Sequence, residues 1–198
     1  MPPDDVYTAM TSNGKHMTSD EDLLEAALRG DEAAFTVVYQ RRQGAVYRFA
    51  LHMSGDAAVS EDVTQEVFLA LLQSGGRFDP ARGALLSFLY GIARNLLRRR
   101  LEKKRPEDSD TLAQELAADD DVLDDLTRRE SIEAVRSAVL SLPAPYREAV
   151  VLCDLENASY EDAAAALECP VGTVRSRLSR GRAMLGQKLA VKTARSIS

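Results

Sequence analysis

The segment from Ser159 to Leu185 constrains the fold more than any other part of this 198-residue chain. Ser159 and Asp162 stand three residues apart, the spacing of a hydroxyl N-cap and its carboxylate partner at a helix start. Small apolar residues continue this helix until Pro170, which interrupts the helical hydrogen-bond ladder and forces a new start. The segment therefore predicts two helices joined by a tight turn.

The second helix of this pair separates an apolar stripe from a polar, basic face. The stripe recurs at three- and four-residue spacing, at Val174, Leu178, Gly181 and Leu185. No Asp or Glu follows Glu168, whereas seven Lys and Arg do. A helix of this kind suits the recognition position of a helix-turn-helix laid in a DNA major groove. The candidate DNA-contacting residues are Thr173, Arg175, Ser176, Arg177, Ser179, Arg180 and Arg182.

A solvated basic helix on an ordinary helical domain is the alternative interpretation of this segment, since short pattern matches produce false positives. The acid-free tail and the capped first helix both favour DNA binding over that alternative.

The net charge of −6 hides a strong segregation of charge along the chain. Residues 107–130 hold ten acidic and two basic residues, so one short segment makes the whole chain acidic. The acidic total therefore does not exclude a nucleic-acid binder. The aspartates of this segment lack the glycine and terminal glutamate of a calcium loop, so we interpret it as a linker without a metal site. A plain spacer and a charge-dependent regulatory element remain alternative roles for it.

Helical periodicity predicts an all-α fold with two small helical domains joined by the acidic linker, the second domain ending in the helix-turn-helix. Four helices are expected in the first domain, over 19–30, 31–53, 58–73 and 84–105, and two more ahead of the helix-turn-helix, over 130–141 and 146–155. Met10 and Met17 are alternative translation starts. The predicted divisions are a disordered tail at 1–18, a first domain at 19–106, a linker at 107–129, a second domain at 130–190 and a tail at 191–198.

The expected helix over 58–73 carries an unusual polar face. Its apolar stripe comprises Val63, Val67, Leu71 and Leu72. Away from that stripe lies a cluster of polar residues: Glu61, Asp62, Gln65 and Glu66. Considered alone, a face of this kind is most simply a solvated surface.

The C-terminal half of the expected helix over 84–105 is strongly basic. Residues 94–105 contain seven Lys and Arg and one acidic residue, Glu102. Cations at this density repel one another unless an anionic partner lies alongside. Favourable interaction with the helix dipole accounts for one turn of cations but not for three. The run therefore favours contact with a phosphate backbone.

Catalytic, metal and membrane functions find little support in the sequence. Cys153 and Cys169 form no CxxC pair and have no nearby histidines, so reduced thiols are expected and a zinc site is not. The two histidines, His16 and His52, belong to no catalytic constellation, and the chain has no Gly-rich phosphate loop or nucleophile elbow. No signal-peptide or membrane-spanning run is found. We expect a cytoplasmic protein that is not an enzyme and has no cofactor, metal site or membrane insertion.

Three stretches resemble parts of the bacterial RNA polymerase sigma factors. VSEDVTQEVFLALL is similar to their core-polymerase-binding helix, and FLYGIARNLLRRRLEKKRP to their promoter-melting and upstream-reading helix. LPAPYREAVVLCDLENASYEDAAAALECPVGTVRSRLSRGRAML resembles their C-terminal domain, which reads the minus-thirty-five promoter element. With these two domains and no middle one, the chain resembles the extracytoplasmic-function (ECF) type over about residues 20–106 and 130–190.

The resemblance implies a sigma subunit that docks on core RNA polymerase, recognises the minus-thirty-five and minus-ten elements and helps to open DNA. The polymerase-docking residues are then Glu61, Asp62, Gln65 and Glu66. The residues matching those that capture the minus-ten element as an unpaired strand are Phe78, Asp79, Arg82, Arg94, Asn95 and Arg98. The residues matching the readers of the minus-thirty-five duplex are Arg175, Ser176, Ser179 and Arg180, which lie on the face that the helical periodicity singled out. An anti-sigma factor is the usual further partner in this family.

The sequence departs from the family pattern at three positions. Phe88 stands where the family usually has Trp, Arg99 where an acidic residue is common, and Glu168 at the turn glycine of the helix-turn-helix. These departures concern promoter details and not the class of protein. The alternative function is a stand-alone helix-turn-helix transcriptional regulator with a helical regulatory domain, which predicts specific DNA binding by the isolated protein.

Overall fold

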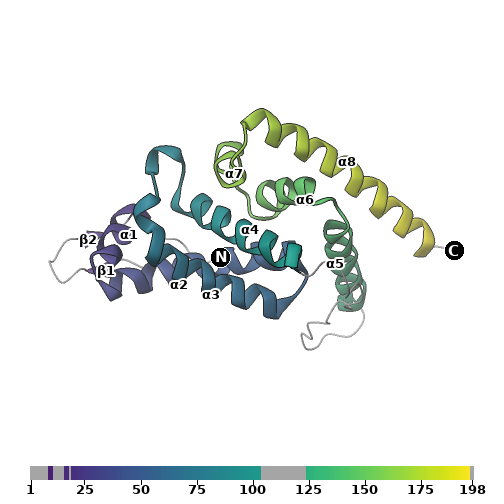
Figure 1. The fold of residues 1–198 in the computed structure, drawn as a ribbon. Coiled ribbons are helices and arrows are strands. Elements are labelled where there is room, and N and C mark those ends of the chain that lie inside the picture. The colour runs from purple at the N-terminus through teal and green to yellow at the C-terminus, as the bar shows by residue number, and fades with distance from the viewer. Residues whose placement is uncertain (1–8, 11–15, 18, 104–123, 197–198) are drawn as a thin grey trace.

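The structure is a computed structural model that describes residues 9–10, 16–17, 19–103 and 124–196 (Figure 1). The first domain contains the helices α1 (Asp20–Leu28), α2 (Glu32–Ser54), α3 (Ala57–Ser74) and α4 (Leu85–Lys103), with short 3-10 helices η2 (Gly75–Arg77) and η3 (Pro80–Arg82) between the last two. The second contains α5 (Asp124–Leu140), α6 (Ala144–Val150), the π-helical turn η4 (Val151–Leu155), α7 (Tyr160–Leu167) and α8 (Val171–Ser196). The predicted all-α class is confirmed.

One antiparallel pair of two-residue strands, β1 (Ala9–Met10) and β2 (His16–Met17), precedes the helices. It lies within the segment predicted to be a disordered tail, and the other residues of 1–18 lie outside the described part of the chain.

Side-chain caps fix the helix starts where the sequence predicts them. The Ser19 hydroxyl accepts a hydrogen bond from the backbone N–H of Asp22 at 3.1 Å, and Ser159 accepts one from Asp162 at 3.0 Å. Each bond satisfies a donor that the first helical turn leaves without a partner. At the far end of α2, Gly55 adopts a left-handed φ of +73°, which glycine tolerates and which ends the helix before α3.

The helices of the second domain extend beyond both of its predicted limits, 130 and 190. α5 begins at Asp124, so residues 124–129 of the predicted linker are helical, while 107–123 lie outside the described residues. α8 continues to Ser196, past the predicted domain end at 190.

The two domains share one hydrophobic core. Leu23, Phe49 and Leu89 of the first domain belong to the same buried cluster as Leu152 and Val174 of the second. The alanine-rich α7 lies against α4, which brings segments far apart in the sequence side by side (Figure 1). A smaller cluster joins α6 to α8 and comprises Leu142, Ala149, Val150 and Leu178.

α4 and α7 approach each other closely because small residues line their contact. Ala163 and Ala166 of α7 are buried there, and a Cβ added at Gly91 of α4 would lie 3.5 Å from the carbonyl oxygen of Ala166. Longer side chains at these positions would force the helices apart. The packing of the second domain on the first is therefore encoded in this small-residue contact.

The prediction that Leu72 faces the core is wrong. Leu72 is 43% exposed and its neighbour Leu69 is 58% exposed, whereas Val63, Val67 and Leu71 are buried. Each helical residue turns about 100° from the previous one, so Leu72 rotates away from the stripe that Leu71 ends.

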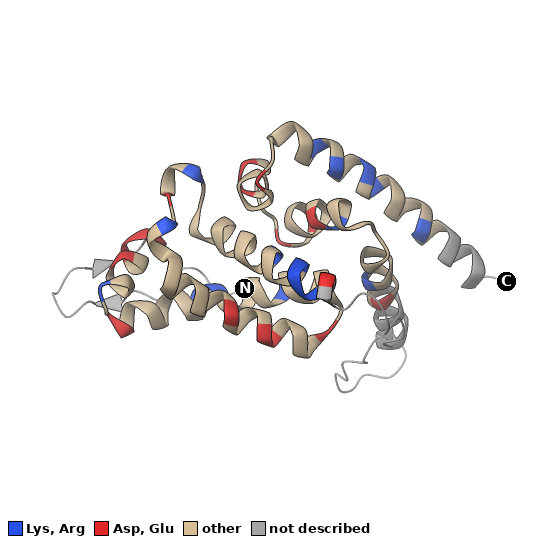
Figure 2. Ribbon diagram, in the orientation of Figure 1, with Lys and Arg blue, Asp and Glu red and all other residues tan. Residues whose placement is uncertain are grey.

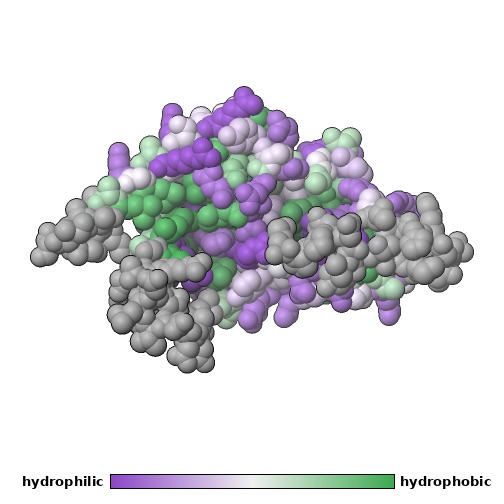
Figure 3. All heavy atoms as spheres, turned by 180° about the vertical axis from the view of Figure 1, so that it is seen from behind, coloured by the Kyte–Doolittle hydropathy of each residue, from purple (hydrophilic) through white to green (hydrophobic). Residues whose placement is uncertain are grey.

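Elsewhere on the surface, the face opposite to that of Figure 1 carries a band of apolar residues between hydrophilic zones (Figure 3). In residues 19–103 and 124–196, no helix combines the length and apolarity of a membrane span.

Candidate functional site

The basic face of α8 is exposed, as the sequence predicts. Arg175, Ser176, Ser179, Arg180 and Arg182 are exposed, and Thr173 and Arg177 are half-buried. Figure 2 shows the cations along the outer side of this helix. On the opposite side Val174 and Leu178 are buried, and a Cβ at Gly181 would lie 2.7 Å from Val150 Cγ2. Glycine at this position therefore lets α8 pack directly on α6 and present its polar face outward.

The turn of the helix-turn-helix keeps its geometry without a glycine. Glu168 adopts a left-handed conformation with φ +51° and ψ +45°. Its N–H bonds to the carbonyl of Ala165 at 3.3 Å, and the N–H of Cys169 bonds to that of Ala164 at 3.1 Å. The Glu168 side chain is exposed, so the cost of the substitution is backbone strain and not burial.

Three arginines of the α8 face have contacts within the chain, and that of Arg177 joins its Nη1 to Sγ of Cys169 at 4.0 Å. The Nε of Arg182 donates to Asp154 at 3.0 Å, and the guanidinium of Arg175 lies over the ring of Tyr160, 5.5 Å from its centroid. Arg180 is exposed and forms no ion pair with a described residue. Of these four arginines, Arg180 is therefore the one without an ion pair, ring contact or sulfur contact to a described residue.

A second predicted site is the loop between α3 and α4. The rings of Phe78 and Phe88 lie 5.7 Å apart, and the Asp79 carboxylate accepts a hydrogen bond from the N–H of Ala81 at 3.0 Å, which caps η3. Together with Arg82 these residues line a hollow of about 120 Å³. Ala165 and Glu168 of the second domain form part of its wall. The hollow is therefore bounded on one side by the helix-turn-helix.

The other predicted residues of this site, on α4, point in different directions. Arg94 is turned toward the second domain, where its Nε donates to Oε1 of Glu148 at 3.1 Å, and the two side chains are 14% and 8% exposed. Asn95 is exposed, and Arg98 lies 3.6 Å from Glu102 on its own helix. The structure therefore brings Phe78, Asp79 and Arg82 together around the hollow. Arg94 does not line the hollow and is paired instead with Glu148 of the second domain.

The polar face of α3 is exposed and divides into two halves. Glu61 and Gln65 border a groove of about 370 Å³ whose other wall is α2. Asp62 and Glu66 instead face α4, where the guanidinium of Arg100 bonds to both carboxylates. Leu69 and Leu72 continue the outward face; the sequence analysis left Leu69 unassigned and placed Leu72 in the apolar stripe. The signal was present, since Gln65, Leu69 and Leu72 follow one another at spacings of four and three.

Three of the four described arginines in the basic run over 94–105 have acidic partners within the chain: Arg94, Arg98 and Arg100. Arg99 is exposed and has no ion pair with a described residue. The run is thus partly neutralised internally, and contact with a phosphate backbone stays a prediction.

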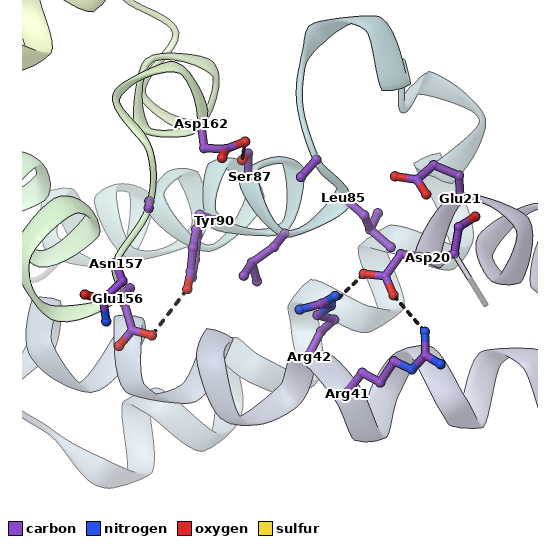
Figure 4. Close-up of a pocket in the computed structure, with 14 residues that line it drawn as sticks. Asp20, Glu21, Arg41, Arg42, Leu85, Ser87, Tyr90, Glu156, Asn157 and Asp162 are labelled. Atoms are coloured by element: carbon purple, nitrogen blue, oxygen red, sulfur yellow. Dashed lines mark hydrogen bonds and ion pairs between the residues drawn. The ribbon is translucent and has the colours of Figure 1, made fainter. Parts of the chain in front are cut away.

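An interdomain cleft of about 500 Å³ lies between α1, α2 and α4 on one side and the segment leading into α7 on the other (Figure 4). At one end Asp20 pairs with Arg42 at 2.6 Å and with Arg41 at 3.4 Å. At the other end Tyr90 and Arg48 both donate to Oε2 of Glu156, at 3.3 and 3.0 Å. The contacts of Glu156 with Tyr90 and Arg48 therefore link the two domains at one end of the cleft.

Burial and hydrogen bonding shift the pKa values of two carboxylates of this cleft in opposite directions. The Glu156 side chain is 1% exposed, and its Oε1 has no hydrogen-bond partner among the described residues. Burial therefore raises the pKa of Glu156, against the opposing effect of Arg48. Burial also disfavours ionised Asp162, but hydrogen bonds, including one from the Ser87 hydroxyl at 2.8 Å, outweigh it and lower the pKa of Asp162. Sequence analysis missed these contacts because the partners lie far apart along the chain.

No group of His, Cys, Asp and Glu suited to a metal ion is found among the described residues. Cys153 and Cys169 are free and half-buried, and burial raises the pKa of the Cys153 thiol. A raised thiol pKa disfavours the reactive thiolate at neutral pH.

The structure combines two packed helical domains, a helix-turn-helix with an exposed basic face and a helix, α3, with an exposed polar face. The Sigma-70 region 2 family model matches residues 38–107, and that of Sigma-70, region 4 matches residues 132–185. The chain belongs to the RNA polymerase sigma factors of the sigma-70 family and is of the ECF type. It is a promoter-recognising subunit that binds core RNA polymerase and promoter DNA.

Curated relatives and solved structures agree with this assignment. The chain is 36% identical over 183 residues to the RNA polymerase sigma-H factor of Pseudomonas aeruginosa, covering 86% of this chain and 93% of that protein. It is 32% identical over 192 residues to the ECF RNA polymerase sigma factor SigM of Mycobacterium tuberculosis, covering 96% and 94%.

Two solved structures have similar folds. CnrH, in complex with the cytosolic domain of CnrY, has a TM-score of 0.67 at 26% identity, covering 87% of this chain and 97% of that one. The sigma factor RpoE of Bartonella quintana, in complex with the anti-sigma factor NepR, has a TM-score of 0.61 at 26% identity, covering 75% and 92%. The alternative of a stand-alone regulator is not favoured by these similarities.

Proposed function

We propose that the three exposed faces divide the work of a sigma subunit among them. The polar face of α3 docks on core polymerase. The loop around Phe78, with Arg94, Asn95 and Arg98 of α4, receives the unpaired minus-ten strand, and α8 reads the minus-thirty-five duplex. The observation that carries this assignment is that the α3 face and the α8 face are both exposed in a chain matched by sigma-70 regions 2 and 4.

On α8, hydroxyls and guanidiniums supply two kinds of contact. Arg180 and Ser179 hydrogen-bond to base edges, and flanking arginines such as Arg182 bind phosphates. On the first domain, the hollow beside Phe78 and Phe88 takes a base that has left the stack, held by aromatic contact and nearby charge. Docking on polymerase then adds a second, linked contact and raises the effective concentration of each DNA-reading face.

The described arrangement is a closed form of the chain. Glu148 holds Arg94, and Ala165 and Glu168 border the hollow at Phe78, so the second domain occupies the approach to the minus-ten site. Capture of an unpaired strand requires α7 to leave α4. This follows from the proposed roles of Arg94 and Phe78 and is supported by their contacts.

An anti-sigma factor is the further partner we propose. The solved relative from Bartonella quintana is in complex with an anti-sigma factor. The chain here acts in the cytoplasm, carries no cofactor and catalyses no reaction, as expected of sigma subunits.

The docking assignment is tested by Asp62→Arg with Glu66→Arg. The double variant is expected to lose association with core RNA polymerase in a pull-down from purified components, while its far-ultraviolet circular dichroism stays that of the parent. Glu25→Arg with Glu133→Arg is the matched control, because these two carboxylates are also exposed and ion-paired but lie away from α3. Full polymerase binding by a folded Asp62/Glu66 variant would remove the α3 face from the proposal.

Promoter-binding titrations of the free chain and of the holoenzyme separate the sigma function from that of a stand-alone regulator. A regulator binds its operator specifically without polymerase, whereas this chain is expected to bind promoter DNA specifically only in the holoenzyme. Specific, high-affinity binding by the free chain would favour the regulator.

A further inference from the structure

Arg100 is the one described arginine of the basic run that contacts the docking face of α3. Its Nη1 lies 3.3 Å from Oδ2 of Asp62, and its Nη2 bonds to Oε1 of Glu66. The two carboxylates stand four residues apart on α3, where like charges repel. A guanidinium between them removes that repulsion and fixes both side chains.

These carboxylates remain accessible despite the contact. The Asp62 side chain is 66% exposed and that of Glu66 is 45% exposed, while Arg100 is 30% exposed. A basic surface on a partner can therefore approach Asp62 and Glu66 from solvent and compete with Arg100 for them. The competition is realistic because exposed ion pairs are weak.

The edge of the Arg100 guanidinium that binds the two carboxylates cannot bind a DNA phosphate at the same time. Its two terminal nitrogens form the fork that binds carboxylates and phosphates alike, and in the described chain both face α3. Arg99, next to it, is exposed and has no ion pair with a described residue. Two adjacent cations of the basic run therefore differ in availability.

We propose that Arg100 is a shared contact that links polymerase docking to DNA binding. In the free chain its guanidinium is held by Asp62 and Glu66; when core polymerase takes over these carboxylates, Arg100 is released to a DNA phosphate. Linkage is reciprocal, so DNA bound at Arg100 also frees the docking carboxylates for polymerase. The strength of exposed ion pairs sets the coupling at about two- to fivefold in affinity. This release of Arg100 from the carboxylates to a phosphate rests on the proposed docking role of the α3 face.

The first test uses the free chain and needs no polymerase. Binding to a non-specific duplex is measured across salt concentrations for the parent, Asp62→Asn with Glu66→Gln, Arg100→Ala and the triple variant. Neutralising the carboxylates is expected to steepen the dependence of log K on log salt by about 0.9, the contribution of one released phosphate contact. In the Arg100→Ala background the same neutralisation should leave the slope unchanged.

Glu25→Gln with Glu133→Gln is the control for a general loss of negative charge, since each residue pairs with an arginine outside the basic run. An equal steepening in this control, or in both backgrounds, would show that Arg100 is not specifically held and would overturn the proposal. An unchanged slope in the parent background would do the same.

The second test compares free chain and holoenzyme. Arg100→Ala should leave the salt slope of the free chain unchanged and lower that of the holoenzyme by about 0.9, whereas Arg99→Ala should lower both. If Arg100→Ala has no effect in the holoenzyme, the handover is refuted. If only the assignment of the α3 face to polymerase docking is wrong, the Asp62→Arg, Glu66→Arg variant will retain polymerase binding. That result distinguishes this failure from a failure of the Arg100 proposal.

Discussion

Arg94 of α4 donates a 3.1 Å hydrogen bond to Glu148 of α6 across the boundary between the two domains. Both side chains are largely buried, so the ion pair is screened little by solvent. It gives the closed form a contact that must break before Arg94 can reach DNA. The same arginine is predicted to bind the minus-ten element, so the ion pair with Glu148 would compete with the predicted DNA contact.

Removing Glu148 should destabilise the closed chain. Glu148→Ala leaves Arg94 unpaired in a largely buried setting, which we expect to lower the free energy of unfolding by about 2 kcal/mol, below the 3–5 kcal/mol of a fully buried pair because Arg94 keeps some exposure. Urea unfolding measures this loss. The Arg94→Ala, Glu148→Ala double variant should lose less than the sum of the single variants, and strict additivity would argue against a direct interaction.

The same substitution should raise affinity for unpaired DNA. With Glu148→Ala the Arg94 guanidinium is free, so the folded chain without polymerase should bind a single-stranded minus-ten oligonucleotide more tightly, by fluorescence anisotropy. Glu102→Ala is the control, since Glu102 pairs with Arg98 on the same helix and not across domains. Equal gains for both variants would indicate a general charge effect.

The α8 face yields a prediction that separates base readout from phosphate contact. Arg180→Ala should cost about 1–3 kcal/mol of binding by the holoenzyme and relax sequence preference. Arg182→Ala should weaken all sequences alike and lower the salt slope by about one. Binding titrations on parent and mutated promoters measure both effects. Identical salt slopes and sequence profiles for the two variants would show that the face is wrongly assigned.

Asp154 adds a second check on Arg182. Its carboxylate holds the Arg182 guanidinium at 3.0 Å, so Asp154→Asn should release the arginine and strengthen binding to all sequences. In an Arg182→Ala background, Asp154→Asn should have no such effect beyond the small gain from one lost negative charge.

Local features were predicted well because their physics is local. The helix starts at Ser19 and Ser159 and the buried stripe through Val174 each depend on residues within a few positions of one another. The exposed α8 face followed from the same periodicity. Leu72 was misplaced because one residue at the edge of a stripe turns by about 100°, which a count of apolar positions does not resolve.

Contacts between distant segments were beyond sequence reasoning. Glu148 and Glu156 look like ordinary charged residues in the sequence, and their side chains are buried where the second domain packs on the first. Their partners, Arg94 and Arg48, are 54 and 108 residues away. No periodic pattern connects such positions, so the closed arrangement could not be derived from the chain alone.

The turn at Glu168 predicts a stabilising substitution. An L-residue in the left-handed region costs roughly 1–2 kcal/mol, while glycine adds about 0.5–1 kcal/mol of chain entropy to folding. Glu168→Gly should therefore stabilise the chain by about 0.5–1 kcal/mol in urea unfolding, since the exposed side chain loses no buried contact. Gly55→Ala is the opposite case: φ is +73° and its Cβ would lie 2.8 Å from Leu140 Cδ1, so it should destabilise. Destabilisation by Glu168→Gly would indicate a contact of its carboxylate that stabilises the turn.

Glu156 predicts the pH dependence of the interdomain contact. Because burial raises its pKa above 4.5 in the folded chain, its contribution to stability is fully present below pH 4.5 and is lost as pH rises through the folded pKa. Glu156→Gln cannot titrate, so the free energy of unfolding of the parent minus that of this variant should fall as pH rises above 4.5, by no more than about 1.4 kcal/mol per pH unit. Asp162→Asn is the control with the opposite sign: the lowered pKa of Asp162 gives stability above pH 3.8 that is lost as pH falls through the folded pKa. Urea unfolding of the three proteins between pH 3 and 8 measures both differences. If the difference between the parent and Glu156→Gln is flat or rises with pH, burial does not control the pKa of Glu156.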